Sequence, residues 1–217
     1  PGYGKYEDYC PSLKESSIAD LQLVPYILGC CSTVDEVIKA VEAVHVHNID
    51  PRASTAHWRF ADPSGRQVVL EIIGEKCVFY ENTLGVLTNS PSFDWQLTNL
   101  NNYVNLKSGA VTENTVGSLE LHSFGGGSGM LGLPGDFTPP SRFVRAAFFQ
   151  TTAPKLPDAD RTVIQAFHIL NNFDLPIGVQ TAAGVTPPDI PSATQFTTAT
   201  DLSGRKIYIR TMFNSHI

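Results

Sequence analysis

The sequence lacks concentrated positive charge and long apolar runs. Its 217 residues include 15 Lys and Arg against 21 Asp and Glu, which gives a formal net charge of -6. Because nucleic acids are bound by clustered Lys and Arg, the absence of such a cluster argues against a nucleic-acid partner. No stretch approaches about 18 consecutive apolar residues, so no membrane span is predicted. We expect a small-molecule ligand that is neutral or weakly charged.

Cysteine and histidine are also sparse. The four cysteines are too few for a disulfide scaffold in a chain of this size, and none forms the C-x-x-C pattern of a zinc site. We expect Cys30 and Cys31, which follow an apolar helix-like stretch, to pack as small buried residues. His45 and His47 fall at the tail of a predicted helix. The sequence indicates neither a metal site nor another cofactor.

The composition suits one packed core, because 42% of the residues are hydrophobic. We therefore predict a single domain over residues 1–217. The chain opens with Pro1 and Gly2, without an initiator methionine or a signal-peptide pattern. This opening predicts a fragment or a processed subunit.

Apolar residues at helical spacing predict two helices near the start of the chain. The first covers residues 18–28 and is expected to end at Gly29, because glycine suits a left-handed helix end. Thr33 and Glu36 have the spacing of a capping box, in which each side chain accepts a hydrogen bond from the other residue's backbone amide. The second helix is predicted over residues 34–44.

The period of the apolar residues then changes to that of strands. Short segments rich in branched and aromatic residues are separated by turn signals, which predicts an antiparallel meander over residues 55–61, 66–73, 76–81 and 84–89. A helix over residues 93–104 is predicted directly behind the last strand.

The second half opens with a glycine-dense loop at residues 124–136, which lets the backbone approach a substrate or another chain segment. It lacks the G-K-[ST] ending of a phosphate loop. Helices are predicted from Pro139 onward and over residues 158–173, and a hairpin is predicted around Ser203 and Gly204. Segregated helices and antiparallel strands indicate an α+β fold.

Two polar residues stand out as candidates for chemistry. Asn89 follows the last predicted strand, where its amide NH2 can donate to an oxyanion if the turn fixes its direction. Arg142 lies in the first turn of a predicted helix, directly after the glycine-dense loop. From the residues alone, the favoured interpretation is an Asx-turn residue for Asn89 and a surface cation or structural ion pair for Arg142.

Two long motifs resemble one known family. Residues 87–106, LTNSPSFDWQLTNLNNYVNL, and residues 129–148, GMLGLPGDFTPPSRFVRAAF, are similar to signature blocks of the choloylglycine hydrolase family. That family comprises bile salt hydrolases and penicillin V acylases. The resemblance extends over residues 1–214.

The resemblance implies an N-terminal nucleophile hydrolase with a four-layer αββα sandwich, incomplete in this chain, that cleaves linear amide C–N bonds without a cofactor. In that family a cysteine at the mature N-terminus supplies the nucleophilic thiol, and its own α-amino group acts as the base. Asn89 matches the family's oxyanion-hole asparagine, and Arg142 matches the arginine that favours the thiolate. The nucleophilic cysteine would precede Pro1, so we expect this chain alone to be inactive.

The resemblance also implies a substrate class and partners. The segment containing Ile49, Pro51 and Ala56 would border the acyl pocket. Conjugated bile salts are the main expectation, but Asp50 and Arg52 make this segment polar, so penicillin V or another N-acyl amide is the alternative. A non-catalytic binding protein with the same fold is the second alternative. Family members are often homotetramers, so we expect a homo-oligomer, in the cytoplasm or alternatively in the periplasm.

Overall fold

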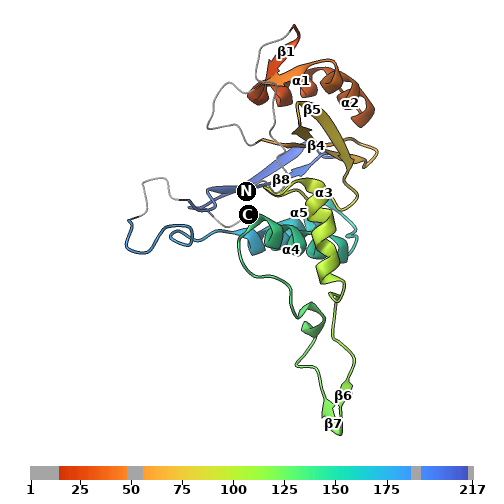
Figure 1. Ribbon diagram of the computed structural model, residues 1–217, viewed down its shortest axis with the longest axis vertical. Helices are drawn as coiled ribbons and strands as arrows, with labels where there is room; N and C mark the ends of the chain where they lie inside the picture. The colour runs from red at the N-terminus through yellow and green to blue at the C-terminus, as the bar shows by residue number, and fades with distance from the viewer. Residues whose placement is uncertain (1–14, 48–55, 187–191, 215–217) are drawn as a thin grey trace. The chain divides into compact units, whose positions relative to one another are not determined.

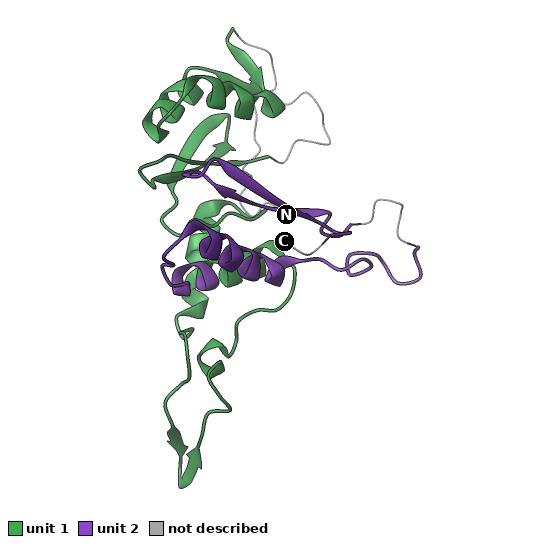
Figure 2. Cartoon of the chain, turned by 180° about the vertical axis from the view of Figure 1, so that it is seen from behind, with its two compact units in different colours: residues 1–147 green, residues 148–217 purple. Residues whose placement is uncertain are grey.

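The computed structural model describes residues 15–47, 56–186 and 192–214 (Figure 1). The chain divides into two compact units, residues 1–147 and residues 148–217, and the boundary falls within one helix, α4 (Figure 2). The elements of unit 1 are β1 (Ser17–Ala19), η1 (Asp20–Gln22), α1 (Leu23–Cys30), α2 (Val34–Glu42), β2 (His45–His47), β3 (Trp58–Ala61), β4 (Gln67–Ile73), β5 (Lys76–Glu81), α3 (Phe93–Asn99), η3 (Leu100–Tyr103), β6 (Asn114–Val116), β7 (Leu119–Leu121), η4 (Ser128–Met130) and the start of α4 (Pro139–Thr152). Unit 2 contains α5 (Ala159–Leu170), η5 (Asn171–Phe173), β8 (Phe196–Asp201) and β9 (Lys206–Thr211).

The start of unit 1 departs from the predicted pair of helices. Ile18 lies in β1 and pairs in parallel with Val46 of β2, so the first helix begins only at Leu23. Gly29 lies inside α1, which ends at Cys30, and the backbone of the next residue, Cys31, is extended. The strand β2 also contains His45 and His47, which the sequence analysis had assigned to a helix tail. The predicted helix start at residue 18 and the predicted helix tail at residues 45–47 are wrong for one reason. These two segments form strands because they pair with each other, and local spacing does not reveal a pairing between distant segments.

The capping box of α2 is confirmed. The Thr33 hydroxyl accepts a hydrogen bond from the Glu36 amide at 3.3 Å, and Glu36 Oε2 accepts one from the Thr33 amide at 3.1 Å. The helix buries Val34, Val37 and Val41 on one face, as the predicted spacing requires. In contrast, Cys30 is exposed and Cys31 is half-buried, so the expectation that both are buried is wrong.

The meander forms an antiparallel sheet in the order β3-β4-β5. Its central strand β4 is covered on both faces. Leu70 and Ile72 pack into a core cluster with α1 and α2, whereas Val69 packs into a second cluster with Phe93 of α3 and Phe143 of α4. Because neighbouring strand residues point to opposite faces, this double cover explains the nearly continuous apolar sequence of β4.

The predicted strand at residues 84–89 is not formed. The buried Asn82 side chain binds both main-chain groups of Val86, donating from Nδ2 to the carbonyl at 3.1 Å and accepting at Oδ1 from the amide at 3.3 Å. These two bonds occupy groups that a strand neighbour would need. The segment therefore leaves the sheet as an irregular connection to α3.

The glycine-dense loop approaches another chain segment, which is one of its two predicted uses. The Gly129 amide donates to the Gly109 carbonyl at 2.9 Å, and the Lys107 amide donates to the Gly129 carbonyl at 3.0 Å. Between these contacts the chain forms the hairpin β6–β7, which the sequence analysis did not predict. All six residues of its strands are exposed.

Unit 2 agrees with the sequence prediction. Asp158 caps α5 by accepting a hydrogen bond from the Arg161 amide at 2.8 Å. The strands β8 and β9 form the predicted antiparallel hairpin, and Thr197 lies opposite Arg210. The helix α5 packs on β8, and Phe167 of this helix is buried.

Candidate active site

The turn that carries Asn89 is fastened to two helices. Gln96 of α3 is buried, and its Nε2 donates to the Asn89 carbonyl at 3.3 Å and to the Pro91 carbonyl at 3.5 Å. The Thr88 hydroxyl donates to the Pro139 carbonyl at 3.1 Å, at the start of α4. The Ser90–Pro91 peptide bond is cis. Hydrogen bonds on both sides of Asn89 therefore hold its backbone in one position.

The start of α4 is organised by a carboxylate. Asp136 accepts hydrogen bonds from the Ser141 hydroxyl at 2.6 Å and from the hydroxyl and amide of Thr138 at 2.6 and 2.9 Å. These donors, Ser141 first, lower the pKa of Asp136 to about 2, because they stabilise the ionised form. Arg145, which is buried, donates to the carbonyls of Pro134 and Asp136 at 2.7 and 2.6 Å. Hydrogen bonds to the Asp136 side chain and to the backbone carbonyls of Pro134 and Asp136 therefore fix the loop before α4.

Asn89 and Arg142, 53 positions apart in the sequence, are in direct contact. Arg142 Nη2 donates to Asn89 Oδ1 at 2.7 Å, while Arg142 Nε donates to the Phe137 carbonyl at 3.0 Å. Burial, and then the charge of Arg145, lower the pKa of Arg142, but a guanidinium stays protonated at physiological pH. The two residues predicted as a catalytic pair are therefore neighbours.

This contact fixes which end of the Asn89 amide is available. A guanidinium only donates, so it must face the amide oxygen and not the NH2 group. No other described residue accepts a hydrogen bond from Asn89 Nδ2. Asn89 is exposed, so this NH2 group is free to donate to a ligand. The arrangement suits the stabilisation of a developing oxyanion.

The predicted acyl-pocket residues are only partly described. Ala56 is half-buried and packs against the core cluster of α1, α2 and β4. Ile49 and Pro51 lie outside the described residues. A role for these three residues in substrate binding stays a prediction.

Cys31 and Cys77 do not have the properties of an activated nucleophile. Burial, and then a hydrogen bond with Cys30, raise the pKa of Cys31 to about 11. Burial, followed by the charge of Glu42, also raises the pKa of Cys77. A catalytic cysteine needs a lowered pKa, because the thiolate is the nucleophile. Cys10 lies outside the described residues.

Two further residues, Glu71 and Gln96, support the turn and were not predicted from the sequence. Glu71 of β4 is fully buried, and its Oε1 accepts a hydrogen bond from the amide of Phe93, the first residue of α3, at 2.9 Å. The same oxygen lies 3.2 Å from His57 Nδ1. An acidic residue inside the apolar run VVLEII was the signal, because a buried carboxylate must find donors. Gln96, a buried amide on an otherwise apolar helix face, gave a similar signal.

Among residues 15–47, 56–186 and 192–214, no three or more His, Cys, Asp or Glu side chains are grouped so that they could hold a metal ion. Within the same ranges, no helix is long and apolar enough to cross a membrane.

An amide donor oriented by an arginine, on an α+β scaffold, suits the class of hydrolases that stabilise an oxyanion during acyl transfer. Within that class the chain belongs to the linear amide C–N hydrolases of the choloylglycine hydrolase family, whose sequence profile matches residues 1–217. The chain is 37% identical over 196 residues to the bile salt hydrolase/transferase of Clostridium perfringens (strain 13 / Type A), covering 88% of this chain and 58% of that protein. It is 35% identical over 220 residues to the bile salt hydrolase/transferase of Lactiplantibacillus plantarum, covering 100% of this chain and 66% of that protein.

A solved structure confirms the fold class. The crystal structure of a variant of conjugated bile acid hydrolase from Clostridium perfringens matches with a TM-score of 0.84 at 33% identity, over 97% of this chain and 65% of that chain. The fold is therefore α+β of the N-terminal nucleophile hydrolase type, as predicted. The chain spans less than two thirds of the length of these relatives.

Proposed function

We propose that the complete protein hydrolyses the linear amide C–N bond of a conjugated bile salt and releases glycine or taurine. The observation that carries this proposal is the 2.7 Å bond from Arg142 to Asn89 Oδ1, which leaves the Asn89 NH2 group as a directed donor. The two bile salt hydrolase/transferases that are 37% and 35% identical to this chain support the substrate class.

The proposed reaction proceeds through a thioester. A cysteine thiolate supplied from outside residues 1–217 attacks the amide carbon, and the carbonyl oxygen becomes an oxyanion that accepts a hydrogen bond from Asn89 Nδ2. Protonation of the amine lets it leave, and water then hydrolyses the thioester to the free acid and restores the thiol. Arg142 holds Asn89 in orientation and keeps the local potential positive, which favours the thiolate. On this proposal the chain alone is inactive.

A penicillin V acylase is the alternative activity within the same mechanism. It is favoured by the polar residues Asp50, Arg52 and Ser54 in the segment expected to border the acyl pocket, because a steroid would be bound by a more apolar wall. Side-by-side assays of the complete protein on a glycine-conjugated bile salt and on penicillin V separate the two. If neither is hydrolysed, the second alternative, a non-catalytic binding protein, is favoured.

We further propose that the complete protein is a homo-oligomer, as family members often are. The support is the hairpin β6–β7, on which Val116, Leu119 and Leu121 are 63%, 62% and 40% exposed. A second copy would cover these apolar side chains. The expected compartment, cytoplasm or periplasm, stays a prediction.

The role of Asn89 is tested in the complete protein. Asn89→Ala should lower the turnover of a glycine-conjugated bile salt about 100-fold or more, which is the usual loss for an oxyanion donor. Asn102→Ala is the matched control, because Asn102 is an exposed asparagine whose side chain binds only Asn99. Turnover that Asn89→Ala leaves unchanged would remove Asn89 from the mechanism.

Whether an N-terminal cysteine is the nucleophile is tested by mass spectrometry, N-terminal sequencing and thiol labelling. Intact mass spectrometry and N-terminal sequencing of the native protein should find a mature N-terminal cysteine, and labelling with iodoacetamide should modify that residue and abolish turnover. A native protein whose sequence begins at Pro1 would overturn this part of the proposal.

A further inference from the structure

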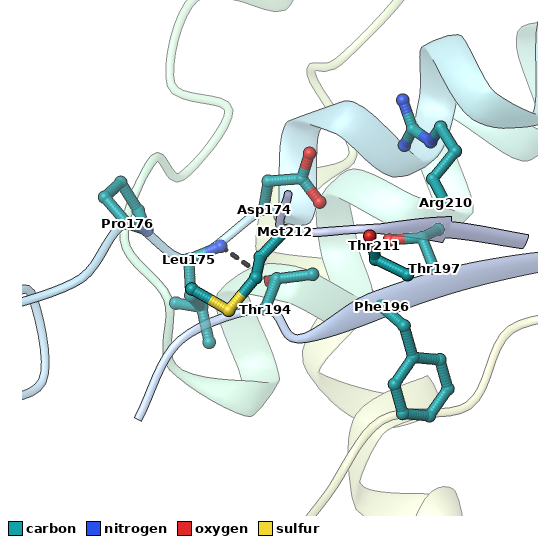
Figure 3. Close-up of a pocket in the computed structure, with 9 residues that line it drawn as sticks. All are labelled: Asp174, Leu175, Pro176, Thr194, Phe196, Thr197, Arg210, Thr211 and Met212. Carbon is teal, nitrogen blue, oxygen red and sulfur yellow. Dashed lines mark hydrogen bonds between the residues drawn. The ribbon is translucent and has the colours of Figure 1, made fainter. Parts of the chain in front are cut away.

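Unit 2 contains a cavity of about 240 Å³ that the proposed reaction does not use. It lies between the β8–β9 hairpin and the segment that follows η5, and its lining is drawn in Figure 3. Its polar lining consists of Arg210, Asp174 and the threonines Thr194, Thr197 and Thr211. Met212 contributes to the apolar part of the wall.

Arg210 is a buried cation that has no anionic partner within residues 15–47, 56–186 and 192–214. The residue is only 9% exposed, and its guanidinium carbon lies 4.4 Å from the centre of the Phe167 ring. Among the described residues none accepts a hydrogen bond from it or forms an ion pair with it, and its Nε is buried without a partner. A buried charge that is neither paired nor hydrogen-bonded is costly. Arg210 therefore indicates an anionic group in the cavity.

Asp174 supplies the opposite charge at the edge of the same cavity. It is exposed, and Figure 3 shows its carboxylate on the same side of the hairpin as Arg210, with Phe196 on the other side. The two residues do not pair with each other within the described chain. A carboxylate beside the anion position repels a simple anion but attracts an ammonium group. The two charges together select a molecule that carries both signs.

Two hydrogen bonds fix the part of the cavity wall between Asp174 and Arg210. Thr194 Oγ1 accepts a hydrogen bond from the Leu175 amide at 2.8 Å, and the Thr194 amide donates to the Leu175 carbonyl at 3.1 Å. Thr197 lies directly opposite Arg210 in the hairpin. The loop carrying Asp174 is thereby held beside the strand pair that carries Arg210.

We propose that this cavity binds a small zwitterionic amino acid, with its acidic group on Arg210 and its ammonium group on Asp174. The cavity of about 240 Å³ has room for an amino acid of the size of glycine or taurine. The inference concerns binding in unit 2 and does not depend on the proposed hydrolysis.

A methionine reports on this cavity directly. The described chain has Met212 in the cavity wall and Met130 in unit 1, in η4. In the complete protein labelled with [methyl-13C]methionine, glycine and taurine should shift the Met212 methyl signal in a saturable manner, while Met130 stays unshifted. The Met212 signal is assigned with the variant Met212→Leu. A Met212 signal that stays unchanged at saturating glycine and taurine would overturn the proposal.

Ligands with a single charge, and variants of the two charged residues, test whether the cavity requires a ligand that carries both charges. Acetate and methylamine should each bind at least about tenfold more weakly than glycine, because each engages one charge only. Asp174→Asn should weaken glycine binding about fivefold, as expected for an exposed charge pair, and Asp160→Asn, an exposed acid on α5, should not. Acetate binding as tightly as glycine, or an Asp174→Asn variant with unchanged affinity, would contradict the proposal. Arg210→Lys, which keeps the charge but loses the fork of donors, should weaken both glycine and acetate.

Discussion

Gln96 connects α3 to the turn that carries Asn89. Its amide nitrogen donates to the Asn89 carbonyl at 3.3 Å, whereas Asn89 Oδ1 is held by Arg142 at 2.7 Å. Backbone and side chain of Asn89 are therefore fixed by different residues. An oxyanion donor is effective when its direction is set before the reaction, so Gln96 is a positioning residue under the proposed mechanism.

Gln96→Glu should lower kcat about tenfold with little change in KM. The substitution keeps the shape of the side chain, but it replaces a donor by a carboxylate that faces two carbonyl oxygens. Asn101→Asp is the matched control, because its amide also donates to a backbone carbonyl, that of Thr98, but at an exposed position. If Gln96 acts through Asn89, Gln96→Glu should have little further effect in an Asn89→Ala background. Fully additive losses would contradict this role.

Asp136 makes the stability of the α4 start depend on pH. Its pKa is lowered to about 2, mainly by the Ser141 and Thr138 hydroxyls, while an unfolded aspartate titrates near 3.8. The ionised form therefore stabilises the folded state above about pH 4, and this contribution is lost as the pH falls through about 2. Asp136→Asn should lower the Tm at pH 7, and the difference from the wild type should shrink as the pH is lowered from about 4 toward 2. A pH-independent difference between Asp136→Asn and the wild type would contradict the assignment.

At the scale of elements, local chemistry was predictable and distant pairing was not. Thr33 and Glu36 identified the start of α2, because a capping box is formed by residues three positions apart. The false strand at residues 84–89 and the late start of α1 depend on Asn82 and on the β1–β2 pairing, which only the folded chain reveals. For the same reason the motifs located Asn89 and Arg142, but their contact across 53 positions was not visible in the sequence.

The base of the β6–β7 hairpin requires glycine at position 129. A Cβ atom there would lie 2.4 Å from the Lys107 carbonyl oxygen and 2.9 Å from that of Gly109, and neither backbone oxygen can move freely. Gly129→Ala should therefore weaken both hydrogen bonds between these segments and destabilise the hairpin base by about 1–3 kcal/mol. Hydrogen–deuterium exchange should show faster exchange of the amides at positions 107 and 129 than in the wild type.

A nearby glycine provides the control for this substitution. A Cβ atom at Gly126 would meet open space, so Gly126→Ala should leave the same amides protected. Equal exchange in Gly129→Ala and in the wild type would show that the neighbouring backbone adapts to the methyl group.

At the scale of the whole molecule, the exposed hairpin β6–β7 offers an apolar surface for the proposed homo-oligomer. A two-stranded hairpin is marginally stable by itself in water, and this one exposes Val116, Leu119 and Leu121. A second copy that covers these side chains would stabilise the hairpin and hide its apolar surface. The proposed homo-oligomer thus accounts for a feature that unit 1 leaves uncovered.

Leu119→Asp should dissociate the oligomer of the complete protein into smaller species. A carboxylate buried against a second copy without a partner costs several kcal/mol, enough to lower the association constant by a factor of about 100 or more. Light scattering coupled to size-exclusion chromatography measures the mass, and circular dichroism checks that each subunit stays folded. Val104→Asp is the control, because Val104 is 89% exposed but lies just after η3, outside the hairpin. An unchanged mass for folded Leu119→Asp would exclude the hairpin from the interface, and a monomeric wild-type protein would overturn the oligomer itself.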